Sequence, residues 1–130
     1  MQAVYYRNRD GEQPVDEFID SLAPRHAAVV DNQIDRLNML KPSDPPLPFP
    51  HSSQVSGQLR ELRCHYGGSH YRVLYRRSGR LIVLLHVSAK RSAKIPKREI
   101  ETARKRWADF KARMDANPRR PPRAAGHDAP

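Results

Sequence analysis

The sequence contains little of what several common classes of protein require. Cys64 is the only cysteine among 130 residues, so the chain can form no internal disulfide and has no cysteine-rich zinc site. No run of about eighteen apolar residues is present, which is the length that spans a membrane. Residues 1–7 lack the basic region and apolar stretch of a signal peptide. We therefore expect an intracellular protein, located in the cytoplasm.

Apolar and aromatic residues are also scarce. Apolar residues make up 38% of the chain and aromatic residues 7%, which suffices for one modest hydrophobic core. We expect a single domain over residues 1–114. Residues 115–130 are rich in proline, arginine and alanine, and this composition predicts a disordered tail.

Acidic residues are scarce in one half of the chain. The net charge is +10, but residues 1–59 carry five basic and eight acidic side chains, whereas residues 60–113 carry sixteen basic and four acidic ones. A contiguous basic region attracts polyanions, and their phosphates release counterions when they bind. The alternative is a well-solvated basic surface without a ligand. Because the excess lies in one half of the chain, nucleic-acid contact is the favoured interpretation.

The first part of the chain predicts one strand and two helices. Residues 4–6 are β-branched and aromatic and precede turn residues, which is typical of a strand. Pro14 and Pro24 are each well placed as the first residue of a helix, where the missing N–H is not needed. Apolar residues follow each proline at helical spacing, namely Val15, Phe18, Ile19 and Leu22, then Ala27, Val30, Ile34 and Leu37. We expect an antiparallel helix pair covering a sheet.

Residues 41–50 contain five prolines and permit neither a helix nor a central strand. Proline-rich segments can be recognition ligands, but a stiff connector is the more common role within a small domain.

The second half predicts three strands and a helix. Residues 59–63 and 71–76 read as two strands joined through residues 64–68, and the unbroken apolar run at 81–85 predicts a strand with both faces buried. A basic loop over residues 89–97 precedes a helix with apolar residues at Ile100, Ala103, Trp107, Phe110 and Met114. The order indicates an α+β fold. We expect a small, mostly antiparallel sheet, with two N-terminal helices packed on it and a C-terminal helix.

The sequence shows no phosphate-binding loop, hydrolase triad or metal site. Its six histidines are scattered and form no pair at metal-ligand spacing. We therefore expect no metal and no cofactor. What remains is a set of basic residues on adjacent strands and the following loop: Arg60, Arg63, Arg72, Arg76, Lys90, Arg91 and Lys94.

Such a set could cleave RNA without a metal, because the ribose 2′-hydroxyl is itself the nucleophile. The protein must supply a base, an acid and positive charge for the phosphorane. Arginine binds two phosphate oxygens at once and stays charged, and a lysine among other cations can act as a base near neutral pH. This hypothesis requires Arg63 and Arg72 to meet in one solvent-reachable hollow. Solubility or salt bridges are the simpler roles for such arginines.

Several ordered blocks resemble one known family. They are Leu59-Arg60-Glu61-Leu62-Arg63, Tyr71-Arg72-Val73-Leu74-Tyr75, Leu84-Leu85-His86 and Lys90-Arg91-x-x-Lys94-x-Pro96-x-x-Glu99-Ile100-x-x-Ala103. Together with Pro14-Val15-x-Glu17-Phe18-x-x-x-Leu22 they resemble the phage Gp49-like branch of HigB toxins, within the RelE/ParE superfamily. The similarity covers most of residues 4–111.

The resemblance implies a compact microbial RNase fold, ribosome-dependent cleavage of mRNA and neutralisation by a HigA-like helix-turn-helix antitoxin. By motif position, it implies phosphate binding and transition-state stabilisation by Arg63 and Arg72, with Lys90 as the proton-transfer residue. RNA contacts are expected from Arg60, Arg76, Arg91 and Lys94. Ser88 stands where the family usually has an aromatic residue, so a stacking or packing contact is expected to be absent.

Other readings remain open. A ParE-like inhibitor of DNA gyrase would share the fold, and an inactive module would retain only antitoxin binding. For four further residues, structural roles are favoured. Glu61 is expected to be an ion-pair partner within the sheet, Glu99 a carboxylate near the helix dipole, His86 a buried residue between strands and Cys64 a small core residue. The apolar stripe of the last helix is expected to be core rather than an antitoxin-docking surface.

Overall fold

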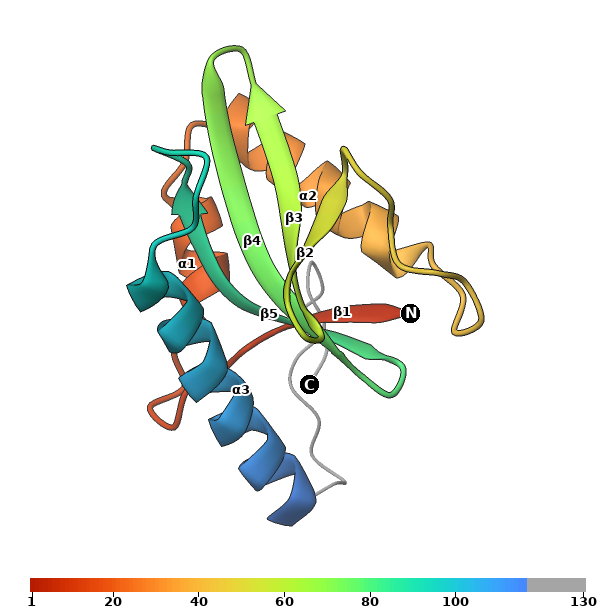
Figure 1. Cartoon of the computed structure of the whole chain (residues 1–130). Helices are drawn as coiled ribbons and strands as arrows, with labels where there is room; N and C mark the ends of the chain where they lie inside the picture. Colours follow the sequence, from red (N-terminus) through yellow and green to blue (C-terminus); the bar gives the residue numbers. More distant parts are fainter. Residues whose placement is uncertain (117–130) are drawn as a thin grey trace.

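The computed structural model describes residues 1–116 (Figure 1). The elements follow in the order β1 (Gln2–Tyr5), α1 (Pro14–Asp20), α2 (Pro24–Asn38), β2 (Ser52–Ser56), β3 (Leu59–Tyr66), β4 (Ser69–Ser78), β5 (Leu81–Ala89) and α3 (Lys97–Ala116). The predicted α+β class is confirmed, and both N-terminal helices begin at the prolines that predict them.

The strands form one sheet in the order β1-β5-β4-β3-β2. All neighbouring strands are antiparallel except β1 and β5, which pair in parallel. The expectation of a small, mostly antiparallel sheet is therefore correct, and the arrangement is consistent with a small RelE-like fold. β3 and β4 join through a two-residue loop, in which Gly67 adopts a φ of 56° that a residue with a side chain rarely tolerates.

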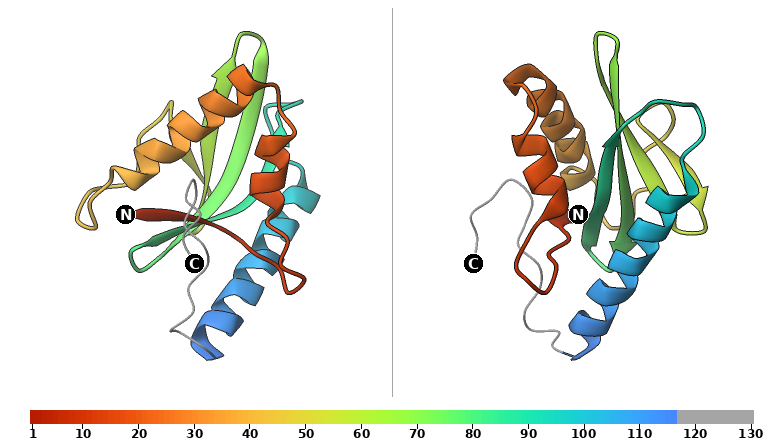
Figure 2. Two further views of the ribbon diagram at one scale, coloured as in Figure 1. Left: turned by 180° about the vertical axis from the view of Figure 1, so that it is seen from behind. Right: turned by 90° about the vertical axis from the view of Figure 1, so that its left-hand side faces the viewer.

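The sheet lies between two layers of helix. Figure 2 shows α1 and α2 on one side of the sheet and α3 on the other. Successive side chains of β5 point to opposite faces of the sheet. Ile82 and Leu84 pack toward α1 and α2, and Val83 and Leu85 pack toward α3. This confirms the prediction that both faces of this strand are buried. Within α3, Phe110 and Ala103 are buried against Val83 and Leu85 of β5, so the apolar stripe of this helix is part of the core.

Strand β2 was not predicted, because its sequence Ser-Ser-Gln-Val-Ser carries no apolar alternation. Its pairing with β3 makes it a strand. Ser52 is fully buried on the α2 side, where its hydroxyl lies 2.5 Å from the hydroxyl of Tyr75. A buried hydrogen bond here takes the place of apolar packing.

The proline-rich stretch at residues 41–50 contains neither helix nor strand and connects α2 to β2, as a connector would. It is fastened to the sheet by two arginines. Arg77 donates to the Pro42 carbonyl at 3.1 Å, and Arg60 donates to the Leu47 carbonyl at 3.1 Å.

Helix α3 ends at Ala116, two residues beyond the predicted end of the domain at residue 114. The remainder of the predicted tail, residues 117–130, lies outside the described residues. None of the helices within residues 1–116 has the length and apolar character needed to cross a bilayer.

Candidate functional site

Arg63 and Arg72 lie directly opposite each other on the neighbouring strands β3 and β4. Paired residues point to the same face of a sheet, and here it is the face on which Leu74 and Leu85 pack under α3. Helix α3 contacts mainly β5 and β4. Figure 1 shows that no helix covers β3 and β2 on this side. The two arginines therefore mark the uncovered part of the sheet.

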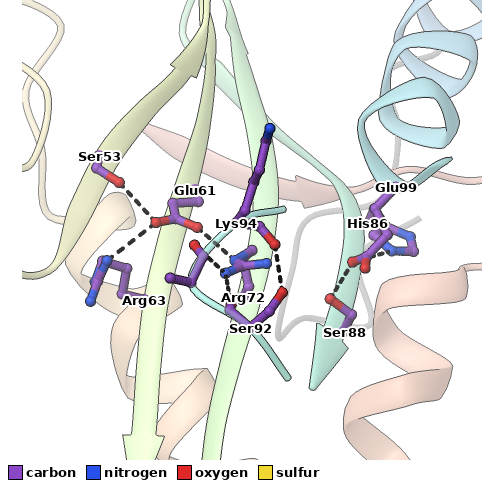
Figure 3. A network of polar contacts seen from close by, with 10 residues as sticks. Ser53, Glu61, Arg63, Arg72, His86, Ser88, Ser92, Lys94 and Glu99 are labelled. Atoms are coloured by element: carbon purple, nitrogen blue, oxygen red, sulfur yellow. Dashed lines mark hydrogen bonds and ion pairs between the residues drawn. The ribbon is translucent and has the colours of Figure 1, made fainter. Parts of the chain in front are cut away.

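Glu61 is the centre of a polar network on this face (Figure 3). Its Oε2 atom lies 2.8 Å from Nε of Arg72. Its Oε1 atom accepts a hydrogen bond from Ser53 at 2.9 Å and lies 3.4 Å from Nη1 of Arg63. Only 7% of Glu61 and 3% of Arg72 are exposed. The structure thus confirms the expectation that Glu61 is an ion-pair partner within the sheet.

Arg72 also holds the loop between β5 and α3. Its Nη2 atom donates to the carbonyls of Ser92 at 3.1 Å and Ala93 at 3.4 Å, and Figure 3 shows this loop beside the guanidinium. The RNA-cleavage hypothesis required both arginines to be open to solvent, and only Arg63 meets this condition. Because Arg72 is held by a carboxylate and two carbonyls, its place in the structure is that of a positioning residue.

Arg63 and Lys90 share a pocket of about 470 Å³ at the edge of β3. The Arg63 side chain is 35% exposed, so it can meet a ligand. Among the described residues that line the pocket, Glu61 is the acidic one, and Arg72 already compensates its charge. The other ionisable residues of the wall are mainly cations and histidines, namely Arg36, His51, Arg63, His65, His70 and Lys90. The pocket therefore attracts anions.

The loop that follows β5 presents three cations. Its start is fixed, because the Lys90 N–H donates to the His70 carbonyl at 2.8 Å. Within residues 1–116, the side chains of Lys90, Arg91 and Lys94 form no hydrogen bond or ion pair. Arg91 and Lys94 are exposed, and Figure 3 shows Lys94 extending away from Arg72. These three charges are available to an anionic ligand.

The structure does not bring Arg60 and Arg76 to this pocket. Arg60 points to the opposite face of β3, where Nε lies 3.3 Å from the Ser52 hydroxyl. Arg76 shares the face of Arg72 but lies over the Trp107 ring, 4.2 Å from its centroid, and donates to Gln58. Both arginines contact other parts of the protein, and the expectation that they contact RNA stays a prediction.

A second network joins β5 to the start of α3. Glu99 accepts hydrogen bonds from the Ser88 hydroxyl and from Nε2 of His86, the latter at 3.2 Å (Figure 3). On the other side of the ring, Nδ1 of His86 lies 3.5 Å from Nη1 of Arg106. Burial lowers the pKa of His86, and the Arg106 charge adds to this effect, while Glu99 opposes it. The neutral ring satisfies both contacts by donating from Nε2 and accepting at Nδ1. Ser88 thus forms a polar link between β5 and the start of α3.

Phe49 belongs to the site although no sequence pattern singled it out. The Arg63 guanidinium lies 4.8 Å from the centroid of its ring. Two neighbours of Arg63 were missed as well, since Gln33 donates to the Arg63 carbonyl at 2.7 Å and the His51 carbonyl accepts from the Arg63 N–H at 2.8 Å. In the sequence, Phe49 is recognisable only as an aromatic residue between two prolines, and this pattern does not predict which residue the ring contacts.

The arrangement is suited to binding a phosphodiester. Arg63 supplies a planar, permanently charged group at a solvent-reachable position, and Lys90 supplies an ammonium on the same pocket wall. Across residues 1–116, no three His, Cys, Asp or Glu side chains are grouped so that they could hold a metal ion.

Comparison with protein families identifies one family. The model of the family described as Phage derived protein Gp49-like (DUF891) matches residues 17–108. The chain belongs to this family. No curated protein matches the chain significantly.

The Gp49-like family is a toxin-like family of the RelE/HigB type, and membership therefore makes this chain a toxin-like protein. It also implies a nuclease-like activity and an antitoxin partner in general terms. The match spans α2, every strand from β2 to β5 and most of α3, so it includes all of the pocket residues described above.

The buried ion pair gives a first prediction. Glu61→Gln leaves the Arg72 guanidinium buried without its counter-charge, and we expect a loss of about 3–5 kcal/mol in the free energy of unfolding, measured with urea. The matched control is Asp115→Asn, which removes one partner of the exposed Lys111–Asp115 pair and should cost less than about 1 kcal/mol. A loss below about 1 kcal/mol for Glu61→Gln would contradict the structural role of this pair.

His86 gives a prediction on pH. The pKa of its ring is lower in the folded than in the unfolded chain, so the unfolded chain takes up the proton first as the pH falls. The free energy of unfolding should therefore decrease as the pH falls below about 6.5, the ordinary histidine value, until the folded protein is protonated too. His86→Gln should flatten this part of the curve in urea titrations between pH 7 and pH 5. An unchanged slope would show that His86 does not contribute to it.

Proposed function

We propose that this chain is the toxin of a type II toxin–antitoxin system and acts as an endoribonuclease on mRNA in the ribosomal A site. A cytoplasmic helix-turn-helix antitoxin of the HigA kind would neutralise it. One observation carries the proposal: the half-exposed Arg63 lines one pocket together with Lys90, whose side chain has no partner within residues 1–116. Membership in the Gp49-like family supports the same class of activity.

The proposed reaction uses the substrate's own nucleophile. The ribose 2′-oxygen forms a bond to the adjacent phosphorus and loses its proton, while the bond to the 5′-oxygen breaks and that oxygen gains a proton. Arg63 binds the phosphate and stabilises the charge of the phosphorane. Lys90, on the same wall, is the candidate for proton transfer, and the exposed Arg91 and Lys94 hold flanking phosphates. Arg72 acts indirectly, by holding the loop that carries these three residues.

The site favours this activity over two others. A ParE-like gyrase inhibitor performs no phosphate chemistry of its own and needs no pocket with unpaired cations. An inactive antitoxin-binding module likewise gains nothing from Arg63 and Lys90 on one open wall. Both alternatives give distinct results in the experiment below.

The proposal predicts cleavage of messages by the purified chain on programmed ribosomes. The cut messages should carry 2′,3′-cyclic phosphate ends, detected by primer extension and end analysis. Arg63→Ala should lower the cleavage rate by about a hundredfold or more, because a charge that stabilises the transition state is lost. The matched control is Arg80→Ala, in the turn between β4 and β5, which removes the same charge from an exposed position outside the pocket. Inhibited supercoiling by gyrase with intact messages would contradict the proposal, as would undisturbed translation.

A second variant separates charge from proton transfer at Lys90. Lys90→Arg keeps the positive charge but cannot give up its proton in a protein. We expect RNA affinity within about twofold of wild type and cleavage reduced by about a hundredfold, the usual contribution of a general acid or base. Full cleavage by Lys90→Arg would limit Lys90 to binding phosphate.

A further inference from the structure

We propose that Phe49 is a platform on which an unpaired RNA base stacks, next to the phosphate that Arg63 binds. This inference rests on the proposed function and deepens it, because it names single-stranded RNA as the ligand and a residue that contacts its bases. Phe49 lies in the proline-rich segment between α2 and β2, within the residues that the family model matches.

The position of the ring is the first argument. The Arg63 guanidinium lies 4.8 Å from the ring centroid, yet 67% of Phe49 remains exposed. The next two residues, Pro50 and His51, line the same pocket as Arg63 and Lys90. A large apolar ring is therefore open to solvent at the rim of a cationic pocket.

The backbone on both sides of Phe49 is also held in place. Before it, the Leu47 carbonyl accepts from Arg60 at 3.1 Å. After it, the His51 N–H donates to the Pro48 carbonyl at 3.0 Å, and the His51 carbonyl accepts from the Arg63 N–H at 2.8 Å. This backbone thus ties Phe49 to the same strand that carries Arg63. The ring contributes nothing to either core cluster, so packing does not explain its position.

The chemistry of the surroundings identifies the occupant. In RNA, one ribose separates a phosphate from its base, so a strand with a phosphate on Arg63 can place a neighbouring base on Phe49. Proteins that bind single strands combine cations along the backbone with aromatic rings under the bases. An antitoxin peptide could also cover an exposed ring, but the cationic wall beside Phe49 favours a polyanion.

The test compares two ligands of equal length. One is a single-stranded 2′-O-methyl RNA, which cannot be cut because its 2′-oxygen carries no proton. The other is an abasic ribose-phosphate strand, which retains the charges and lacks the bases. Affinities are measured by fluorescence anisotropy for wild type, Phe49→Ala, Phe49→Trp, Arg63→Ala and Met39→Ala. Met39 is the matched control, because it is an apolar side chain that is 80% exposed and, unlike Phe49, is not in contact with Arg63 among the described residues.

We expect Phe49→Ala to weaken binding of the base-containing strand about tenfold and that of the abasic strand less than twofold. Phe49→Trp should retain or improve affinity, Arg63→Ala should weaken both strands, and Met39→Ala neither. The stacking role is overturned if Phe49→Ala weakens both strands equally or neither, or if it impairs only neutralisation by the antitoxin.

The message-cleavage assay keeps the two proposals distinguishable. Cleavage by wild type together with unchanged RNA affinity in Phe49→Ala removes the stacking role alone. Absence of cleavage together with selective weakening of the base-containing strand removes the nuclease proposal and leaves Phe49 as an RNA contact. Failure of wild type to bind the base-containing strand overturns the stacking role, while cleavage on programmed ribosomes decides the nuclease proposal separately.

Discussion

The ion pair between Glu61 and Arg72 is the interaction on which the candidate site depends. It connects β3 to β4, receives the Ser53 hydroxyl from β2 and, through the other end of Arg72, fixes the backbone at Ser92 and Ala93. A buried pair of this kind is costly to desolvate and is retained where it defines one geometry. Here that geometry places the basic loop beside Arg63. The two paired arginines thus differ in role, because one organises the site and the other is open to a ligand.

The distribution of charge follows from this arrangement. Some of the cations contact other parts of the protein. Arg60 binds the proline-rich segment through the Leu47 carbonyl, and Arg76 packs over the Trp107 ring. Within residues 1–116, the side chains of Lys90, Arg91 and Lys94 on the loop after β5 have no such partner, and Arg63 at the edge of β3 is only partly engaged by Glu61. The basic excess in the second half of the sequence is therefore only partly available to a nucleic acid, and Arg63 and Lys90 are the part of it that lines the pocket beside Arg72.

Much of the fold could be predicted, because apolar spacing and prolines report directly on which residues are buried and where helices begin. Strand β2 could not, since its buried Ser52 depends on a partner on β4. The opposite directions of Arg60 and Arg63 follow from strand alternation, as the two are three residues apart. The burial of Arg72 could not be foreseen, because it requires both the strand register and the path of a distant loop. For the same reason, the contact between Phe49 and Arg63 has no sequence signature.

The parallel pairing of β1 with β5 has a consequence for how the molecule is made. Gln2 pairs with Leu81, and Tyr5 with Leu84. Strand β1 therefore cannot pair until β5, which leaves the ribosome much later, has been synthesised. The β3–β4 hairpin between them is local and can form sooner, since contacts close in sequence are the fastest to establish. Until β5 has emerged, however, β1 has no partner strand and α3 has not been made. An unfinished copy therefore cannot close the sheet or fix the basic loop, and a truncated translation product would lack the assembled site.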